Sequence, residues 1–123
     1  MTRDDMERHA RAWIDAWNRR DVEAVLSHYA DDAVFISPKA LTFVGTARIE
    51  GKAKLADYWH TASQKIQTLV FRLDRAICDP QAGEMVVLYE ATLNGTTSRA
   101  CELMRFDAAG RQIGGEALYG AAL

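Results

Sequence analysis

The sequence predicts an α+β domain in which a curled antiparallel sheet, shaped as a cone, wraps around three N-terminal helices. Apolar residues recur with a helical period through most of residues 4–65, whereas from residue 66 onwards they alternate with a period of two. Turn residues divide the second half of the chain into consecutive long strands. Helices that precede a meander of strands favour a single antiparallel sheet covered by helices on one face.

Length and composition restrict the class of protein. The chain has 123 residues, so we expect one domain over residues 1–123. The net charge is −2 and both signs are interspersed, which argues against a nucleic-acid partner. No apolar run approaches the ~20 residues of a membrane span, so we expect no membrane partner.

The N-terminal residues and the cysteines predict a cytoplasmic protein. The first ten residues are charged and lack the features of a secretory signal. Cys78 and Cys101 have no CxxC spacing. A lone pair of this kind favours packed, reduced thiols over a disulfide bridge.

Three helices are predicted in the first half of the chain. The first begins at Asp4 or Asp5, both N-cap candidates, and closes at residues 18–20. Its apolar face consists of Met6, Ala10, Trp13, Ile14 and Trp17. Asp21 caps the second helix, and the third begins near Gly51. The apolar positions of the second are Val22, Val25, Leu26 and Tyr29, and those of the third are Leu55, Tyr58, Trp59 and Ala62.

The strands follow from alternation and from turn residues. A short strand is predicted over Ala33–Ser37, stopped by Pro38, and residues 38–51 are predicted as a loop. The long strands begin near residue 66 and are separated by turns at 79–83, at Asn94-Gly95 and at 107–110. Their predicted ranges are 66–77, 84–93, 97–107 and 111–121.

Three segments carry a resemblance to a known family. They read AWNRRDVEAVLSHYADDAVFISP at 16–38, GTARIEGKAKLADYW at 45–59 and LMRFDAAGRQIGGEALYG at 103–120. Together they resemble the NTF2-like superfamily, the cone fold that includes ketosteroid isomerases and SnoaL-like polyketide cyclases. The resemblance implies a pocket in the cone interior, and a homodimer formed across the open sheet face. It does not fix an activity, because this fold hosts enzymes, binding modules and assembly domains.

The resemblance also implies roles for three positions. In the steroid isomerases the residue before the strand-ending proline is the general-base Asp, and here that position is Ser37. The oxyanion-donor Tyr on the first helix corresponds to Trp13, and the neutral carboxylic acid before the Arg-Phe segment corresponds to Glu102. An unassisted serine hydroxyl is not a base near neutral pH. We therefore do not expect the steroid-isomerase mechanism, in which base catalysis contributes about 10²–10⁴-fold.

Glu102 is the candidate catalytic residue, and the sequence leaves its orientation open. It shares a strand face with Met104 and Phe106, where burial would raise its pKa and keep it protonated. The steroid isomerases hold a carboxylic acid neutral in an apolar site, and this interpretation of Glu102 follows their example. The alternative is an outward Glu102, solvated or paired with Arg99 or Arg105.

The register of the following hairpin decides where Glu90 lies. A three-residue loop at 94–96 would bring Glu90 to the face of Glu102, whereas a two-residue loop would turn it away. An outward Glu90 is favoured, because Val87, Tyr89 and Ala91 form the more apolar face of its strand.

Aromatic residues are the candidate ligand-binding groups. A pocket lined by them would suit a flat, mostly apolar organic ligand with one or two polar atoms. The alternative is that they simply pack the core. The candidates are Trp13, Trp17, Tyr29, Phe35, Ser37, Tyr58, Trp59, Met104 and Tyr119.

No cofactor or metal site is expected. His9, His28 and His60 fall on predicted helices without a metal-binding spacing, and we expect them at the surface or at helix ends. Two functions remain: a SnoaL-like enzyme that transfers a proton through Glu102, and a non-catalytic binding or association domain. The enzyme hypothesis requires Glu102 to point into the cone.

Overall fold

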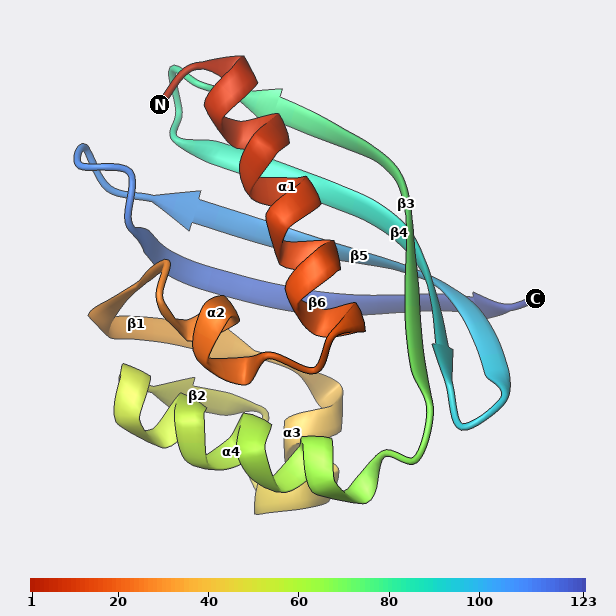
Figure 1. The fold of residues 1–123 in the computed structure, drawn as a ribbon. Coiled ribbons are helices and arrows are strands. Elements are labelled where there is room, and N and C mark those ends of the chain that lie inside the picture. Colours follow the sequence, from red (N-terminus) through yellow and green to blue (C-terminus); the bar gives the residue numbers. More distant parts are fainter.

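A computed structural model describes all residues from 1 to 123 and contains a six-stranded sheet with four helices (Figure 1). The predicted α+β cone class is confirmed. The helices are α1 (Arg3–Asn18), α2 (Val22–Leu26), α3 (Pro38–Val44) and α4 (Lys52–Lys65). The strands are β1 (Tyr29–Ile36), β2 (Arg48–Glu50), β3 (Leu69–Asp79), β4 (Glu84–Leu93), β5 (Thr96–Phe106) and β6 (Gln112–Ala122).

The sheet is mixed, with the strand order β2-β1-β6-β5-β4-β3. Strands β3 to β6 form the predicted antiparallel meander. The last strand then pairs in parallel with β1, with Phe35 opposite Gly115. The prediction of a purely antiparallel sheet was wrong in this pair, because a short early strand carries no sequence signal for its distant partner.

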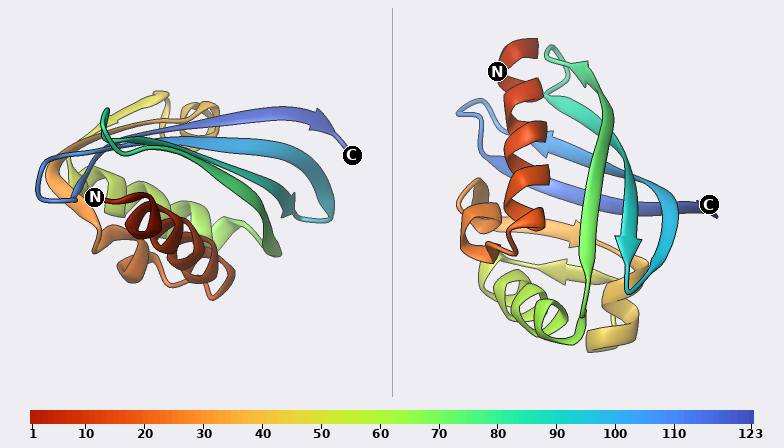
Figure 2. Two further views of the ribbon diagram at one scale, coloured as in Figure 1. Left: turned by 90° about the horizontal axis from the view of Figure 1, so that it is seen from above. Right: turned by 45° about the vertical axis from the view of Figure 1, so that its right-hand side comes forward.

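The sheet arches over the helices and carries them on its concave side (Figure 2). Register shifts accompany the bend, between Leu73 and Arg75 in β3 and between Arg105 and Phe106 in β5. Such irregularities increase strand twist. Helices α1, α2 and α4 fill the hollow, whereas the convex face of β3–β6 has no helix over it (Figure 2).

The first two helices begin where their caps dictate. Thr2, and not Asp4 or Asp5, is the N-cap of α1, because the Thr2 hydroxyl accepts from the Asp5 amide and the Asp5 carboxylate accepts from the Thr2 amide. The predicted Asp21 cap of α2 is confirmed by its bond from the Ala24 amide. Tyr29 belongs to β1 and not to α2.

Residues 38–51 form two short elements instead of the predicted loop. Ser37 caps α3 by accepting from the Lys39 amide at 3.2 Å, Pro38 occupies the first turn, and Gly45 ends the helix with a φ of 81°. Strand β2 then pairs with β1 and buries Ile49. Elements of seven and three residues are too short to show a hydrophobic period.

Two side chains tie the end of α1 to its neighbours. Asn18 donates to the Phe71 carbonyl at 2.9 Å and accepts from the Phe71 amide at 2.7 Å, so it bonds edge strand β3 as another strand would. Arg20, at a φ of 57°, donates to carbonyls at the end of α4. These contacts fix the helix walls around the interior of the cone.

None of the four helices combines the length and the apolar character needed to cross a membrane.

Candidate functional site

A cavity of about 70 Å³ lies between the concave face of the sheet and the helices, and 14 of its 18 lining residues are hydrophobic. Eight of the residues predicted from sequence share this lining. They are Trp13, Trp17, Phe35, Ser37, Tyr58, Trp59, Glu102 and Tyr119. The positions that the family resemblance relates to the steroid-isomerase site, namely Trp13, Ser37 and Glu102, therefore border one space.

Two predicted residues lie outside the lining. Tyr29 is buried beside the Trp59 ring, with 5.3 Å between ring centroids, and its hydroxyl faces Gln112. Met104 is fully buried opposite Met85 in the sheet. Both side chains support the residues that reach the cavity and do not form its wall.

Sequence reasoning missed the other ten lining residues. Phe71 and Tyr89 alternate with exposed or half-buried neighbours, and this period of two could have identified them. The half-buried residues among these ten surround the opening of the cavity, which we call its mouth. They lie on α3, at the end of α4, and at the ends of β3 and β4 that are nearest to it. The ten are Lys39, Phe43, Ala62, Ser63, Ile66, Leu69, Phe71, Tyr89, Leu93 and Ala117.

Glu102 points into the cone. Leu93 pairs with Thr96, so the β4–β5 loop has two residues, both with positive φ. This register sets Glu102 between Val87 and Ala117 on the concave face, where it is 2% exposed. The outward alternative, with Glu102 paired to an arginine, is therefore wrong.

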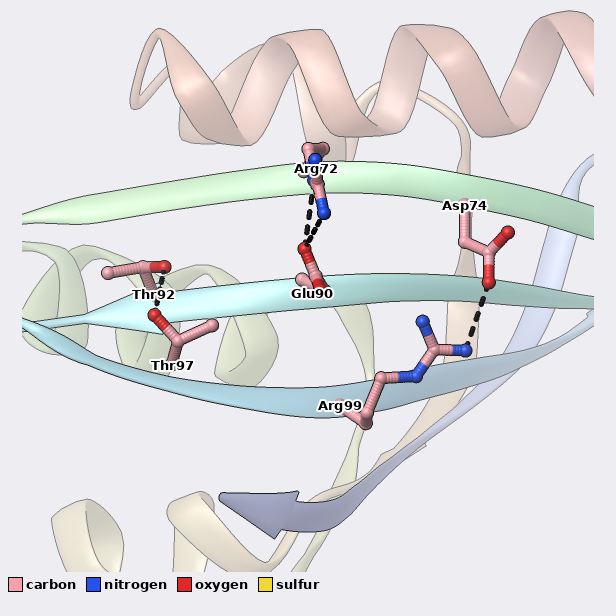
Figure 3. Close-up of polar contacts among 6 residues, drawn as sticks. All are labelled: Arg72, Asp74, Glu90, Thr92, Thr97 and Arg99. Atoms are coloured by element: carbon pink, nitrogen blue, oxygen red, sulfur yellow. Dashed lines mark hydrogen bonds and ion pairs between the residues drawn. The ribbon is translucent and has the colours of Figure 1, made fainter. Parts of the chain in front are cut away.

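Glu90 takes the opposite face, as the two-residue loop requires. Its carboxylate pairs with Arg72 on the convex surface, and Arg99 pairs with Asp74 at 3.0 Å (Figure 3). Thr92 and Thr97 share a hydrogen bond on the same surface (Figure 3). Glu102 is thus the one acidic residue on the cavity wall.

Burial determines the chemistry of Glu102. It raises the pKa of the carboxyl from 4.5 to about 8, because neither oxygen has a hydrogen-bond or ion-pair partner in the protein. The group is therefore mostly protonated at pH 7 and can donate a hydrogen bond. Burial also raises the pKa of the Tyr89 and Tyr119 hydroxyls, and the nearby Glu102 adds to both effects.

Trp13 contributes a second unmet hydrogen-bonding group. Its Nε1 is the one side-chain nitrogen or oxygen that is both shut off from solvent and without a hydrogen-bond partner, although the ring itself packs against Phe71 and Tyr89. Buried polar atoms are nearly always paired, so an orphaned donor in a residue that lines the cavity requires an explanation. A ligand acceptor atom would satisfy the indole N–H, and the acid proton of Glu102 could serve the same ligand.

Ser37 has a structural partner for its hydroxyl. The hydroxyl caps α3 and also lies beside Tyr58 and Tyr119, where its polar contact offsets part of the burial effect that raises their pKa. No histidine lines the cavity, so Ser37 lacks the Ser–His pair that commonly activates a serine nucleophile. No Asp or Arg lines it either, so Glu102 and Lys39 are the only residues of the lining that can carry a full charge near neutral pH.

A buried polar network stands behind the wall. The His9 Nε2 donates to the side-chain Oε1 of Gln112 at 3.2 Å. The side-chain Nε2 of Gln112 donates to the Tyr29 hydroxyl at 2.9 Å and to the backbone carbonyl of Gly114 at 3.1 Å. Gly115 leaves room for this contact, since a Cβ there would lie 3.2 Å from the amide nitrogen.

His9 was predicted at the surface and is instead buried. Burial, together with the neighbouring His28, lowers the pKa of His9 to about 4. Its partner Gln112 gave no sequence signal, because a single glutamine at a strand start is ordinary. No three His, Cys, Asp or Glu side chains come together as a metal site would require.

The model of the SnoaL-like domain matches residues 10–113. The chain belongs to the SnoaL-like family. No curated protein matches it significantly. Among solved structures, a SnoaL-like protein of unknown function from Burkholderia thailandensis is 30% identical, with 98% of each chain covered and a TM-score of 0.86.

More distant structures share the SnoaL-like fold. A putative ketosteroid isomerase from Kribbella flavida is 17% identical over 98% of this chain and 81% of its own, with a TM-score of 0.74. A computationally designed 17-OHP binder is 21% identical over 91% of this chain and 88% of its own, with a TM-score of 0.72. At these identities the likeness concerns the fold.

Proposed function

We propose that this SnoaL-like protein binds a small, flat, mostly apolar organic molecule in the cone and transfers a proton to it through Glu102. The observation that carries the proposal is a buried carboxyl on the cavity wall with no partner in the protein. Trp13 belongs to the same lining, and its buried indole N–H has no partner in the protein, which supports the proposal if a bound ligand shifts the ring enough to reach that N–H.

The chemistry follows from two donors that converge on one ligand. A protonated Glu102 and the Trp13 N–H would donate to an oxygen of the substrate and stabilise negative charge that develops there. A pKa of about 8 lets Glu102 give up a proton and regain it near neutral pH. In a dehydration, protonated Glu102 would give its proton to the departing hydroxyl, and the Glu102 carboxylate would then take the proton that the adjacent carbon loses, so that water leaves and the acid is regenerated. Isomerisation or cyclisation of an oxygenated apolar substrate would balance in the same way, with Glu102 as donor and then acceptor in place of the steroid-isomerase base that Ser37 replaces.

The alternative function is a non-catalytic binding or association domain. The cavity offers only one carboxyl for proton transfer, and no second carboxyl or histidine lies beside it on the wall. Binding without chemistry would use the same two donors to orient a ligand. The two hypotheses differ in whether bound ligand is converted.

We also propose that the protein is a cytoplasmic homodimer. Cys78 and Cys101 are free thiols, which suits a reducing compartment. The convex sheet face exposes Val70, Ile77 and Leu118 with no helix over them. A second copy that covers this face would remove these apolar side chains from water.

Native mass spectrometry of the purified protein tests the proposal. We expect a co-purified organic ligand, and we expect Glu102→Gln to bind it while losing its conversion. Glu90→Gln is the matched control, because it neutralises a carboxylate on the opposite face. Conversion that survives Glu102→Gln would refute the catalytic role. A protein that binds the ligand but never converts it would support the binding function instead.

A further inference from the structure

Lys39 is the one cationic residue on the cavity wall. It stands in the first turn of α3, where its amide donates to the Ser37 hydroxyl that caps the helix. The Nζ lies 4.5 Å from the centroid of the Tyr119 ring, which lines the same cavity. The cap fixes the backbone of this half-buried lysine, and the Tyr119 ring is the neighbour of its ammonium beside the cavity.

No acidic residue balances the charge of Lys39. The seven ion pairs of the protein all use Arg or His as the cation, so the ammonium has no carboxylate partner. The only carboxyl on the cavity wall is Glu102, which burial keeps mostly protonated at neutral pH. The cavity therefore carries about one net positive charge in a chain whose net charge is −2.

An ammonium without a carboxylate partner gains from a ligand anion. Ionised partners make hydrogen bonds about twice as strong as neutral pairs do. The protonated Glu102 would not repel such a ligand, because it carries no charge at pH 7. The two ends of the cavity thus differ in charge, with neutral hydrogen-bond donors in the interior and a cation at the mouth.

We propose that the ligand is an organic acid, with an apolar planar body in the cone and a carboxylate on the Lys39 ammonium. This inference rests on the proposed function and adds the charge of the ligand to it. The oxygen that faces Glu102 and Trp13 then belongs to a second, uncharged group of the same molecule.

A pair of probes that differ only in charge tests the inference. Isothermal titration calorimetry at pH 6.5 would compare 2-naphthoate with 2-naphthamide. We expect the acid to bind about tenfold more tightly, the ratio that one charge-assisted contact supplies. Lys39→Met should reduce the preference to about twofold or less, and Lys39→Arg should retain most of it, which also checks that substitution at this position preserves the fold.

Lys65→Met is the matched control. The Lys65 ammonium also stacks on an aromatic ring, 5.6 Å from the Phe43 centroid, but Lys65 is absent from the lining. Lys65→Met also removes one positive charge near the mouth, but from a residue that does not line the cavity. The preference for the acid should therefore persist in this variant. Equal affinity of the two probes, an equal loss in Lys65→Met and Lys39→Met, or no binding of the acid at millimolar concentration would overturn the inference. The first two outcomes leave the proposed function standing, and native mass spectrometry judges it separately.

Discussion

At the scale of single residues, Glu102 shows how neighbours decide the role of a side chain. Glu90 and Glu102 are both strand glutamates, yet one faces solvent beside Arg72 and the other lies between Val87 and Ala117. The sequence identified Glu102 as the candidate, but its face depended on whether the hairpin loop had two or three residues. That choice is a matter of backbone conformation, which composition alone does not determine.

Ionisation of Glu102 should make the protein less stable as the pH rises. Its pKa is about 8 in the folded state and 4.5 ordinarily, so between these values only the folded state holds the proton. The free energy of unfolding should fall by up to about 1.4 kcal/mol per pH unit in this window and level off above pH 8. Urea denaturation of the wild type and of Glu102→Gln from pH 5 to 9 would measure the difference.

Glu102→Gln should lack this slope, whereas Glu90→Gln should keep it, since Glu90 pairs with Arg72 at the surface. The same decline with pH in the wild type and in Glu102→Gln would contradict the assignment.

At the scale of elements, length and a recognisable cap together separate what the sequence predicts from what it does not, and the five-residue α2 was predicted because Asp21 marks its start. The long amphipathic helices α1 and α4 and the strands of the meander were predicted to within a few residues. Helix α3 and strand β2 were not, because their short ranges leave no repeating pattern. Because α3 was not predicted, its two cavity-lining residues, Lys39 and Phe43, were not predicted either. Ser37, predicted as a strand-end residue, is also the cap that starts α3.

Asn18→Ala should loosen the edge of the sheet beside the cavity. The Asn18 side chain bonds both backbone groups of Phe71, and removal of two such bonds from a partly buried site should cost about 1–3 kcal/mol. Hydrogen exchange of the Phe71 amide should accelerate, and the urea midpoint should fall. Asn18→Asp keeps the acceptor for this amide and should lose less. Unchanged exchange in Asn18→Ala would show that the tie contributes nothing.

At the scale of the whole molecule, the parallel contact of β1 with β6 places the first strand of the chain beside the last. This pairing carries the β1 residues Phe35 and Ile36 to the β6 positions Gly115 and Glu116. The order of predicted helices and strands led to the cone prediction and the family resemblance agreed with it, but neither predicted the parallel pairing. Local patterns specify elements, whereas pairing between strands so far apart in the sequence depends on packing of the complete chain.

The convex face predicts the oligomeric state. Ile77 and Leu118 are 53% and 47% exposed there, with half-buried Val86, Leu88 and Leu103 around them. Sedimentation equilibrium should give twice the chain mass of 13.7 kDa, and Ile77→Lys with Leu118→Lys should shift the protein to monomers. Leu41→Lys, at an equally exposed position on α3, should remain dimeric. A wild-type monomer at micromolar concentration would refute the dimer.

The claim on which the proposed function depends is that Glu102 is a neutral acid inside the cavity at physiological pH. The most direct test is a carbon-13 NMR titration of its side-chain carboxyl from pH 4 to 9.5, assigned with Glu102→Gln. A midpoint near pH 8 is the result we predict, because burial is the cause of the raised pKa. A midpoint near 4.5, the ordinary value, would contradict the account.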